Sequence, residues 1–120
     1  MIVLLLTEIK ILLADMKTLS PLHLVFTSPF QHQGLKQALA TSQSDHCILL
    51  LENGVYGALK SCALLNPLAT QHLTLFALEA SVIATGVSQM QAGLHPHIQL
   101  ISWEEFVALT THAQPITSWY

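Results

Sequence analysis

The fold is decided by the sequence HCILLLENGVYGA, residues 46–58. An unbroken apolar run from Cys47 to Leu51 ends there at a turn signal, Glu52-Asn53-Gly54. A short apolar run bounded in this way is typical of a strand that is covered on both faces. A helical pattern follows over residues 55–65. The segment is therefore half of a βαβ unit, and it predicts a parallel sheet packed between layers of helices.

The composition suits one domain with an extensive apolar core. The chain has 120 residues, of which 52% are apolar and 9% are charged. So few charges favour an oligomer with apolar contacts. The formal net charge of −3 argues against direct binding to nucleic acid or to an anionic membrane, because phosphate groups attract basic patches. Two cysteines are too few for a disulfide framework, and we expect a reduced, cytoplasmic protein.

Residues 1–20 precede the regular alternation of strands and helices. Their apolar side chains fall at helical spacing, but Glu8 and Lys10 interrupt the run. The run is shorter than the roughly 18 apolar residues of a transmembrane helix, and it lacks the basic start and cleavage site of a signal peptide. We expect residues 1–20 to be an N-terminal extension, helical or disordered, with Met16 as an alternative start. Residues 21–120 are expected to form a single domain.

The remaining elements are predicted from turn signals and apolar spacing. A strand is expected over 22–27, and the sequence SPFQ at 28–31 has the signals of a capped helix start, so a helix is expected over 28–41. The helical pattern of 55–65 ends at Asn66-Pro67. Further along, we expect a strand over 72–78, a helix over 79–85, a strand over 98–101, a helix from 102 to 114, and a tail over 116–120.

Two capping signals define the helices of the C-terminal half. Gly86 suits the C-terminal cap of the helix before it, and Ser102 with Glu105 forms a capping box. One face of the last helix is expected to consist of Trp103, Phe106, Val107 and Thr110. The strict alternation predicts a small three-layer α/β domain, with a mostly parallel sheet of four to five strands and helices on both faces.

The carboxyl ends of the predicted strands are the expected place for a ligand, as in other open parallel sheets. Ser28, the acids Glu52 and Glu79, and Trp103 are expected there. The two acids could form a carboxylate pair, but acids near helix starts more often stabilise the helix dipole. The glycines of residues 54–57 only weakly resemble a phosphate-binding loop, so we expect no nucleotide cofactor.

Histidine and cysteine are the other candidates for chemistry. His95 and His97 have no cysteine near them in sequence, and loop histidines without a metal are expected. Cys47 opens the buried strand, and Cys62 shares a helical face with Val55, so both thiols are expected to pack in the core. The residues by themselves therefore predict no catalytic, cofactor-binding or metal-binding site.

Several segments, taken in order, resemble one protein family. They are LHL and TSPF within 22–30, LLLENGVY at 49–56, ALE and ATGV within 77–87, SWEEFVALT at 102–110, and Trp119. Their order and spacing are similar to those of the TusB/DsrH family of the DsrEFH-like superfamily, closest to its TusB branch. The resemblance covers residues 22–120. Thr85 and Ser102 depart from the family pattern, which usually has arginine and aspartate there.

The resemblance implies a part in a sulfur relay. TusB-type proteins assemble with TusC- and TusD-like sister subunits into a heterohexamer, TusBCD. That complex takes persulfide sulfur from TusA and passes it towards TusE for 2-thiolation of the tRNA wobble uridine, and its catalytic cysteine is on the TusD subunit. In the DsrH branch, which serves sulfur oxidation, a cysteine occurs in the first helix, and the matching position here is Ala38. This departure favours a non-catalytic subunit of the TusB branch.

Three hypotheses of different classes follow. The first is a structural subunit that buries apolar surface against its sister subunits and requires no cofactor of its own. The second is a sulfur-carrier enzyme in which Cys62 or Cys47 holds a persulfide, which requires an exposed, acidic thiol. The third is a regulatory domain that binds a small ligand at the strand ends.

Overall fold

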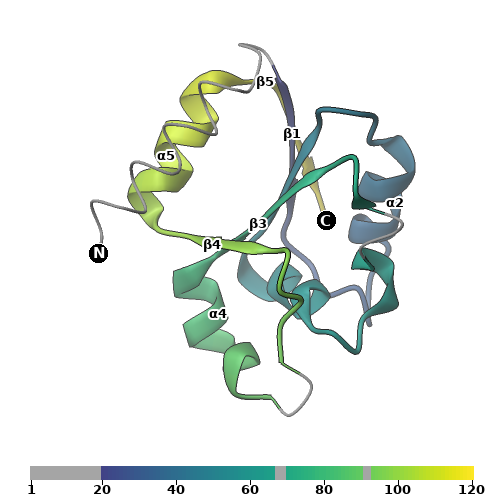
Figure 1. Ribbon diagram of the computed structural model, residues 1–120, viewed down its shortest axis with the longest axis vertical. Helices are drawn as coiled ribbons and strands as arrows, with labels where there is room; N and C mark the ends of the chain where they lie inside the picture. The colour runs from purple at the N-terminus through teal and green to yellow at the C-terminus, as the bar shows by residue number, and fades with distance from the viewer. Residues whose placement is uncertain (1–19, 67–69, 91–92) are drawn as a thin grey trace.

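The computed structural model of the chain describes residues 20–66, 70–90 and 93–120. These ranges contain a five-stranded sheet of order β4-β3-β2-β1-β5, in which every strand is parallel to its neighbours (Figure 1). The strands are β1 (Ser20–Val25), β2 (Cys47–Leu50), β3 (Thr74–Leu78), β4 (Gln99–Ile101) and β5 (Ala113–Trp119). The predicted α/β class and parallel sheet are confirmed. Apart from Ser20, the predicted N-terminal extension lies outside the described residues.

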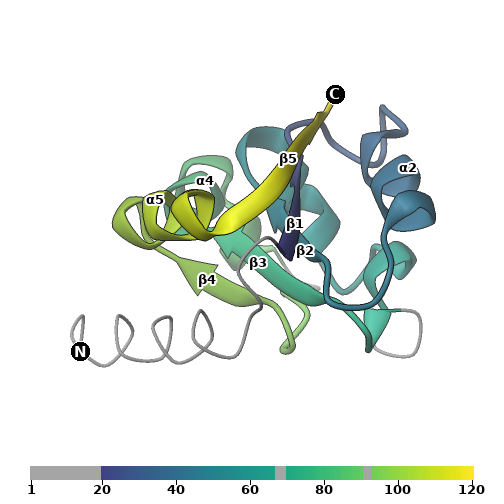
Figure 2. The same cartoon turned by 90° about the horizontal axis from the view of Figure 1, so that it is seen from above.

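Short helices connect the strands. The α-helices are α2 (Gly34–Thr41), α4 (Glu79–Thr85) and α5 (Trp103–His112). The 3-10 helices are η1 (Glu52–Ala58), η2 (Ala63–Leu65) and η3 (Val87–Gln89). In both views α2 and α5 lie on opposite sides of the strands (Figures 1 and 2). The sheet is therefore the middle layer of three, as expected for crossovers that cover both faces of a parallel sheet.

The central strand β2 is buried along its whole length, as the apolar run predicts. Its side chains alternate between two cores. Ile48 and Leu50 belong to the first core, which also takes Leu35 of α2, Val55 of η1 and Val82 of α4. The second core lies on the opposite face. It consists of Leu22, Leu24, Cys47, Leu49, Leu51, Phe76, Leu78, Ile101 and Leu109. Because neither face of β2 meets solvent, the strand tolerates no polar side chain.

The predicted helix over 28–41 is wrong in its first part, because α2 begins only at Gly34. Ser28 does form a cap-like bond, in which its Oγ accepts from the backbone N–H of Phe30 at 3.2 Å. Its backbone oxygen also accepts from the N–H of Gln31 at 3.2 Å and of His32 at 2.9 Å. These bonds close a tight turn. A serine that bonds to its neighbours' backbone favours such turns as readily as helix starts.

The predicted helix over 55–65 is also wrong, because this stretch forms η1 and η2. The backbone between them pairs with a distant segment instead of continuing a helix. The N–H of Lys60 donates to the oxygen of Gly93 at 2.9 Å, and the N–H of His95 donates to the oxygen of Ala58 at 2.8 Å. Leu59 is extended, at φ −65° and ψ 139°. The apolar spacing in this stretch therefore marks burial, and tertiary pairing decides the backbone conformation.

The signals at the ends of the last two helices predict the structure well. Gly86 caps α4 in the left-handed region, at φ 73°. Ser102 and Glu105 form a complete capping box at the start of α5. The predicted face of α5 is only partly right, because Phe106 packs against the second core whereas Trp103 and Val107 are 53% and 57% exposed. Glu105 and Leu109 are buried in their place, so the glutamate of the capping box also lies on the packed side.

The C-terminal residues form a strand and not the predicted tail. β5 pairs in parallel with β1, with Leu22 opposite Ile116 and Val25 opposite Trp119. The sequence contains Pro115, which cannot donate to a neighbouring strand. The register shifts by one residue in this part of the ladder. β5 is an edge strand, where proline is tolerated because only one side of the strand is paired.

Two glycines of η1 predict a graded response to alanine. A Cβ on Gly54 would collide with the backbone oxygen of Val25, whereas a Cβ on Gly57 would lie 2.6 Å from Cδ2 of Leu35, a side-chain end that can move. We expect Gly54→Ala to lower the free energy of unfolding by about 3 kcal/mol and Gly57→Ala by about 1 kcal/mol. Urea unfolding measures both. Equal losses in the two variants would contradict this packing.

Candidate functional site

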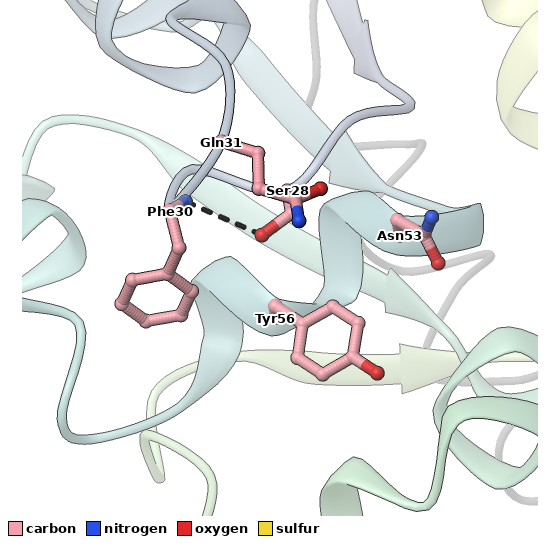
Figure 3. Close-up of a pocket in the computed structure, with 5 residues that line it drawn as sticks. All are labelled: Ser28, Phe30, Gln31, Asn53 and Tyr56. Atoms are coloured by element: carbon pink, nitrogen blue, oxygen red, sulfur yellow. Dashed lines mark hydrogen bonds between the residues drawn. The ribbon is translucent and has the colours of Figure 1, made fainter.

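The carboxyl ends of β1 to β4 meet at one edge of the sheet, and Asn53 lies there between two open pockets. The first, which we call the β1–η1 pocket, has a volume of about 370 Å³. It is lined by Ser28, Phe30, Gln31, Asn53 and Tyr56 (Figure 3). A pocket therefore lies at the carboxyl ends of the strands, where open parallel sheets are expected to bind a ligand.

The β1–η1 pocket combines two aromatic rings with neutral polar groups. In Figure 3 the rings of Phe30 and Tyr56 project towards the same side, and Asn53 lies beyond Tyr56 on η1. Phe30 is 61% exposed. Hydroxyl and amide groups can bind a neutral polar group, and the rings can stack on a flat one. Among the described residues, the lining contains no thiol, carboxylate or imidazole, so these residues offer no nucleophile for sulfur transfer.

The second pocket, which we call the α4–α5 groove, has a volume of about 380 Å³. It is lined by Glu52, Asn53, Ala80, Ser81, Ala84, Thr85 and Trp103. The N–H of Glu52 donates to Oγ of Ser81 at 2.9 Å, which fixes the end of β2 to α4. Glu52 has a left-handed backbone, at φ 51°. Non-glycine residues in this region are strained and are often found at functional sites.

The two acids named from the sequence have different surroundings. Glu52 lines the α4–α5 groove, and Glu79 is the first residue of α4. Both side chains are exposed. Glu79 suits its position because a carboxylate stabilises the positive end of a helix. Of the residues expected at the strand ends, Ser28, Glu52 and Trp103 line pockets there.

Both cysteines lie away from these pockets and neither forms a disulfide. Cys47 opens β2 at the opposite edge of the sheet and is 1% exposed. Burial raises the pKa of its thiol to about 11, although a hydrogen bond with Thr74 acts in the other direction. Cys62 is 4% exposed. The core placement predicted for both thiols is confirmed, and a buried thiol is a poor nucleophile.

The loop histidines do come together, but they do not complete a metal site. The rings of His95 and His97 are 5.1 Å apart between centroids. Nε2 of His95 lies 3.0 Å from the backbone oxygen of Cys62, so the ring donates a hydrogen bond there. Over the described ranges, no group of three or more His, Cys, Asp or Glu side chains is arranged to hold a metal ion.

A hydrogen-bonded chain of three side chains was not predicted from the sequence. Nε1 of Trp119 donates to Nδ1 of His23 at 3.0 Å. Nδ1 of His23 is therefore an acceptor, so its neutral ring carries the proton on Nε2 and donates to Nδ1 of His46 at 3.0 Å. These two hydrogen bonds connect β5 to β1 and to the residue before β2. They join positions far apart in the sequence, so no local signal could have revealed them.

Comparison with known proteins gives the same assignment as the sequence motifs. Residues 27–115 match the family model described as DsrH like protein. Protein TusB of Yersinia pestis (strain Pestoides F) is 37% identical over 98 residues, which cover 82% of this chain and 99% of that protein. Protein TusB of Yersinia pseudotuberculosis serotype O:1b (strain IP 31758) matches with the same identity and coverage. The chain belongs to the DsrH-like family.

Two further observations concern the burial of Ala38 and the length of the helices. Ala38, the position at which the resemblance leads us to expect the DsrH-branch cysteine, is fully buried in α2. None of the helices that the structure describes is long and apolar enough to cross a membrane.

The buried His23 predicts that this DsrH-like domain loses stability in mild acid. Burial, and then the nearby His46, lower the pKa of His23 below its usual 6.5. The unfolded chain therefore binds the proton more readily, so the free energy of unfolding falls as the pH drops below 6.5. Protonation of His23 at Nδ1 would also break the bond from Trp119.

Urea unfolding at about pH 7 and about pH 5 checks this expectation. His23→Asn keeps an acceptor for Trp119 but cannot titrate in this range, so its stability should change less between the two pH values. His32→Gln is the control, because His32 is exposed. An identical pH dependence in the wild type and His23→Asn would contradict the role of His23.

Proposed function

We propose that this chain is a non-catalytic structural subunit of a TusBCD-type sulfurtransferase complex in the cytoplasm. It assembles with TusC- and TusD-like sister subunits into a heterohexamer. The complex relays persulfide sulfur from a TusA-like to a TusE-like carrier for 2-thiolation of the tRNA wobble uridine, and this chain contacts neither nucleic acid nor membrane. The observation that carries the proposal is the match to Protein TusB, which extends over 99% of that relative.

The state of the thiols supports a non-catalytic role. Persulfide transfer requires a thiolate that can reach the incoming sulfur. Cys47 and Cys62 are 1% and 4% exposed, and the pKa of Cys47 is raised to about 11. Neither residue lines the β1–η1 pocket or the α4–α5 groove. These observations support the proposal that a sister subunit supplies the reacting sulfur.

The surface supports assembly with other proteins. Few charged residues are available to keep the chain apart from other chains, since they make up 9% of the sequence. Large apolar side chains are exposed over several elements: Phe30, Ile83, Met90, Trp103, Val107, Ile116 and Tyr120. Interfaces between permanent subunits are enriched in such aromatic and aliphatic residues.

Co-expression tests the proposal directly. We expect this chain and the TusC- and TusD-like subunits of the same organism to co-purify as one complex, because exposed apolar surface is buried on assembly. Size-exclusion chromatography with light scattering measures the mass of the complex. A chain that stays monomeric and soluble beside its sister subunits would contradict the proposal.

Two alternatives lead to different results. If Cys62 or Cys47 carried sulfur, incubation of the folded chain with a persulfide donor would add the mass of one sulfur atom to that residue. We expect no such adduct on the folded chain, because both thiols are buried. A DsrH-like subunit of sulfur oxidation is the other alternative; Ala38 in place of the cysteine disfavours it, and assembly with sister subunits from a sulfur-oxidation complex would support it.

A further inference from the structure

The α4–α5 groove has an apolar wall that solvent reaches. Trp103 is 53% exposed, and its ring meets Phe106 edge-on with centroids 5.8 Å apart. Ala80 and Ala84, one turn apart on α4, also line the groove, and their small side chains take up little of its space. Ile83 on the same helix is 68% exposed. A supported, half-exposed tryptophan beside a hollow is a common anchor of protein interfaces.

The polar groups of the groove are mostly engaged within the chain. Oγ of Ser81 accepts from the N–H of Glu52 at 2.9 Å, and Oγ1 of Thr85 donates to the backbone oxygen of Ser81 at 2.9 Å. The carboxylate of Glu52 is different, because no lysine within the described ranges forms an ion pair with it. The groove therefore offers a carboxylate that can accept a hydrogen bond from a ligand.

The distribution of charge over the described residues also favours a cationic ligand at the carboxyl edge. Every glutamate in these ranges follows β2, β3 or β4 at the carboxyl edge: Glu52, Glu79, Glu104 and Glu105. The lysines lie elsewhere, with Lys36 in α2 and Lys60 between η1 and η2. Each of these acids also lies in the first turn of a helix: Glu52 in η1, Glu79 in α4, and Glu104 and Glu105 in α5. The edge attracts a cationic partner and repels an acidic one.

We propose that the α4–α5 groove docks a segment of a partner protein through an arginine, whose guanidinium lies on the Trp103 indole and bonds to Glu52. Arginine suits both Trp103 and Glu52, because its planar guanidinium stacks on aromatic rings and pairs with carboxylates. This chain contains no arginine, so a second copy of it cannot supply the group. The choice of partner rests on the proposed function, in which it is another protein of the relay.

An NMR titration tests the docking chemistry on the full chain. The probe is N-acetyl-arginine amide, and the signals are the indole N–H groups of Trp103 and Trp119. We expect the Trp103 signal to shift in a saturable manner at millimolar probe, while the Trp119 signal stays in place. N-acetyl-citrulline amide, which is the neutral analogue of the probe, should produce little shift, because it lacks the charge.

Variants test whether Glu52 contributes to the binding of arginine. Glu52→Gln should weaken binding by roughly threefold, as expected for one solvent-exposed ion pair. Glu79→Gln is the matched control, because Glu79 lies at the same edge but does not line the groove, and it should change the affinity less. An unmoved Trp103 signal, equal binding of citrulline, or equal losses in the two variants would each overturn the proposal.

Experiments on the assembled complex distinguish this inference from the proposed function. In the co-expressed assembly, Trp103→Ala and Glu52→Gln should weaken retention of one relay protein, while Glu79→Gln, outside the groove, should weaken it less. If the wild-type subunits do not assemble at all, the proposed function fails whatever the arginine titration shows. If they assemble and the Trp103 signal ignores arginine, the groove assignment alone is overturned.

Discussion

The close contact between Gly54 and the backbone oxygen of Val25 is the constraint on which the rest of the structure depends. It lets the chain after β2 fold back over the end of β1, where the N–H of Leu51 also donates to the oxygen of Val25 at 3.1 Å. This fold places η1 over the first core and Asn53 between the two pockets. It also leaves Glu52 at φ 51°, on the wall of the α4–α5 groove.

The elements that could be predicted from the sequence are those with a local physical cause. The apolar run of β2, the left-handed Gly86 and the capping box of Ser102 each act within a few residues, and each is found as expected. The wrong predictions concern distant contacts. Bridges to residues 93–95 replace the helix over 55–65, and β5 depends on pairing with β1 at the other end of the chain, with Pro115 arguing against a strand.

The location of the candidate site could be predicted, but its shape could not. The rule for open parallel sheets places Ser28, Glu52 and Trp103 at one edge, and all three line pockets there. The exposure of Trp103 was missed because apolar spacing alone does not say which stripe of α5 faces the sheet; the buried Glu105 lies on that side. The chain from Trp119 through His23 to His46 joins three segments and has no sequence signal.

The burial of the thiols and the composition of the surface support different roles for this chain and its partner subunits. The described residues include two buried thiols, exposed apolar side chains and glutamates gathered at one edge, which supports the proposal that this chain contributes contact surface while another subunit supplies the reacting sulfur. Sulfur transfer by the assembled complex that contains Cys47→Ala and Cys62→Ala measures this most directly. The account predicts a transfer rate within about twofold of the wild type. Loss of transfer in a complex that still assembles would contradict it.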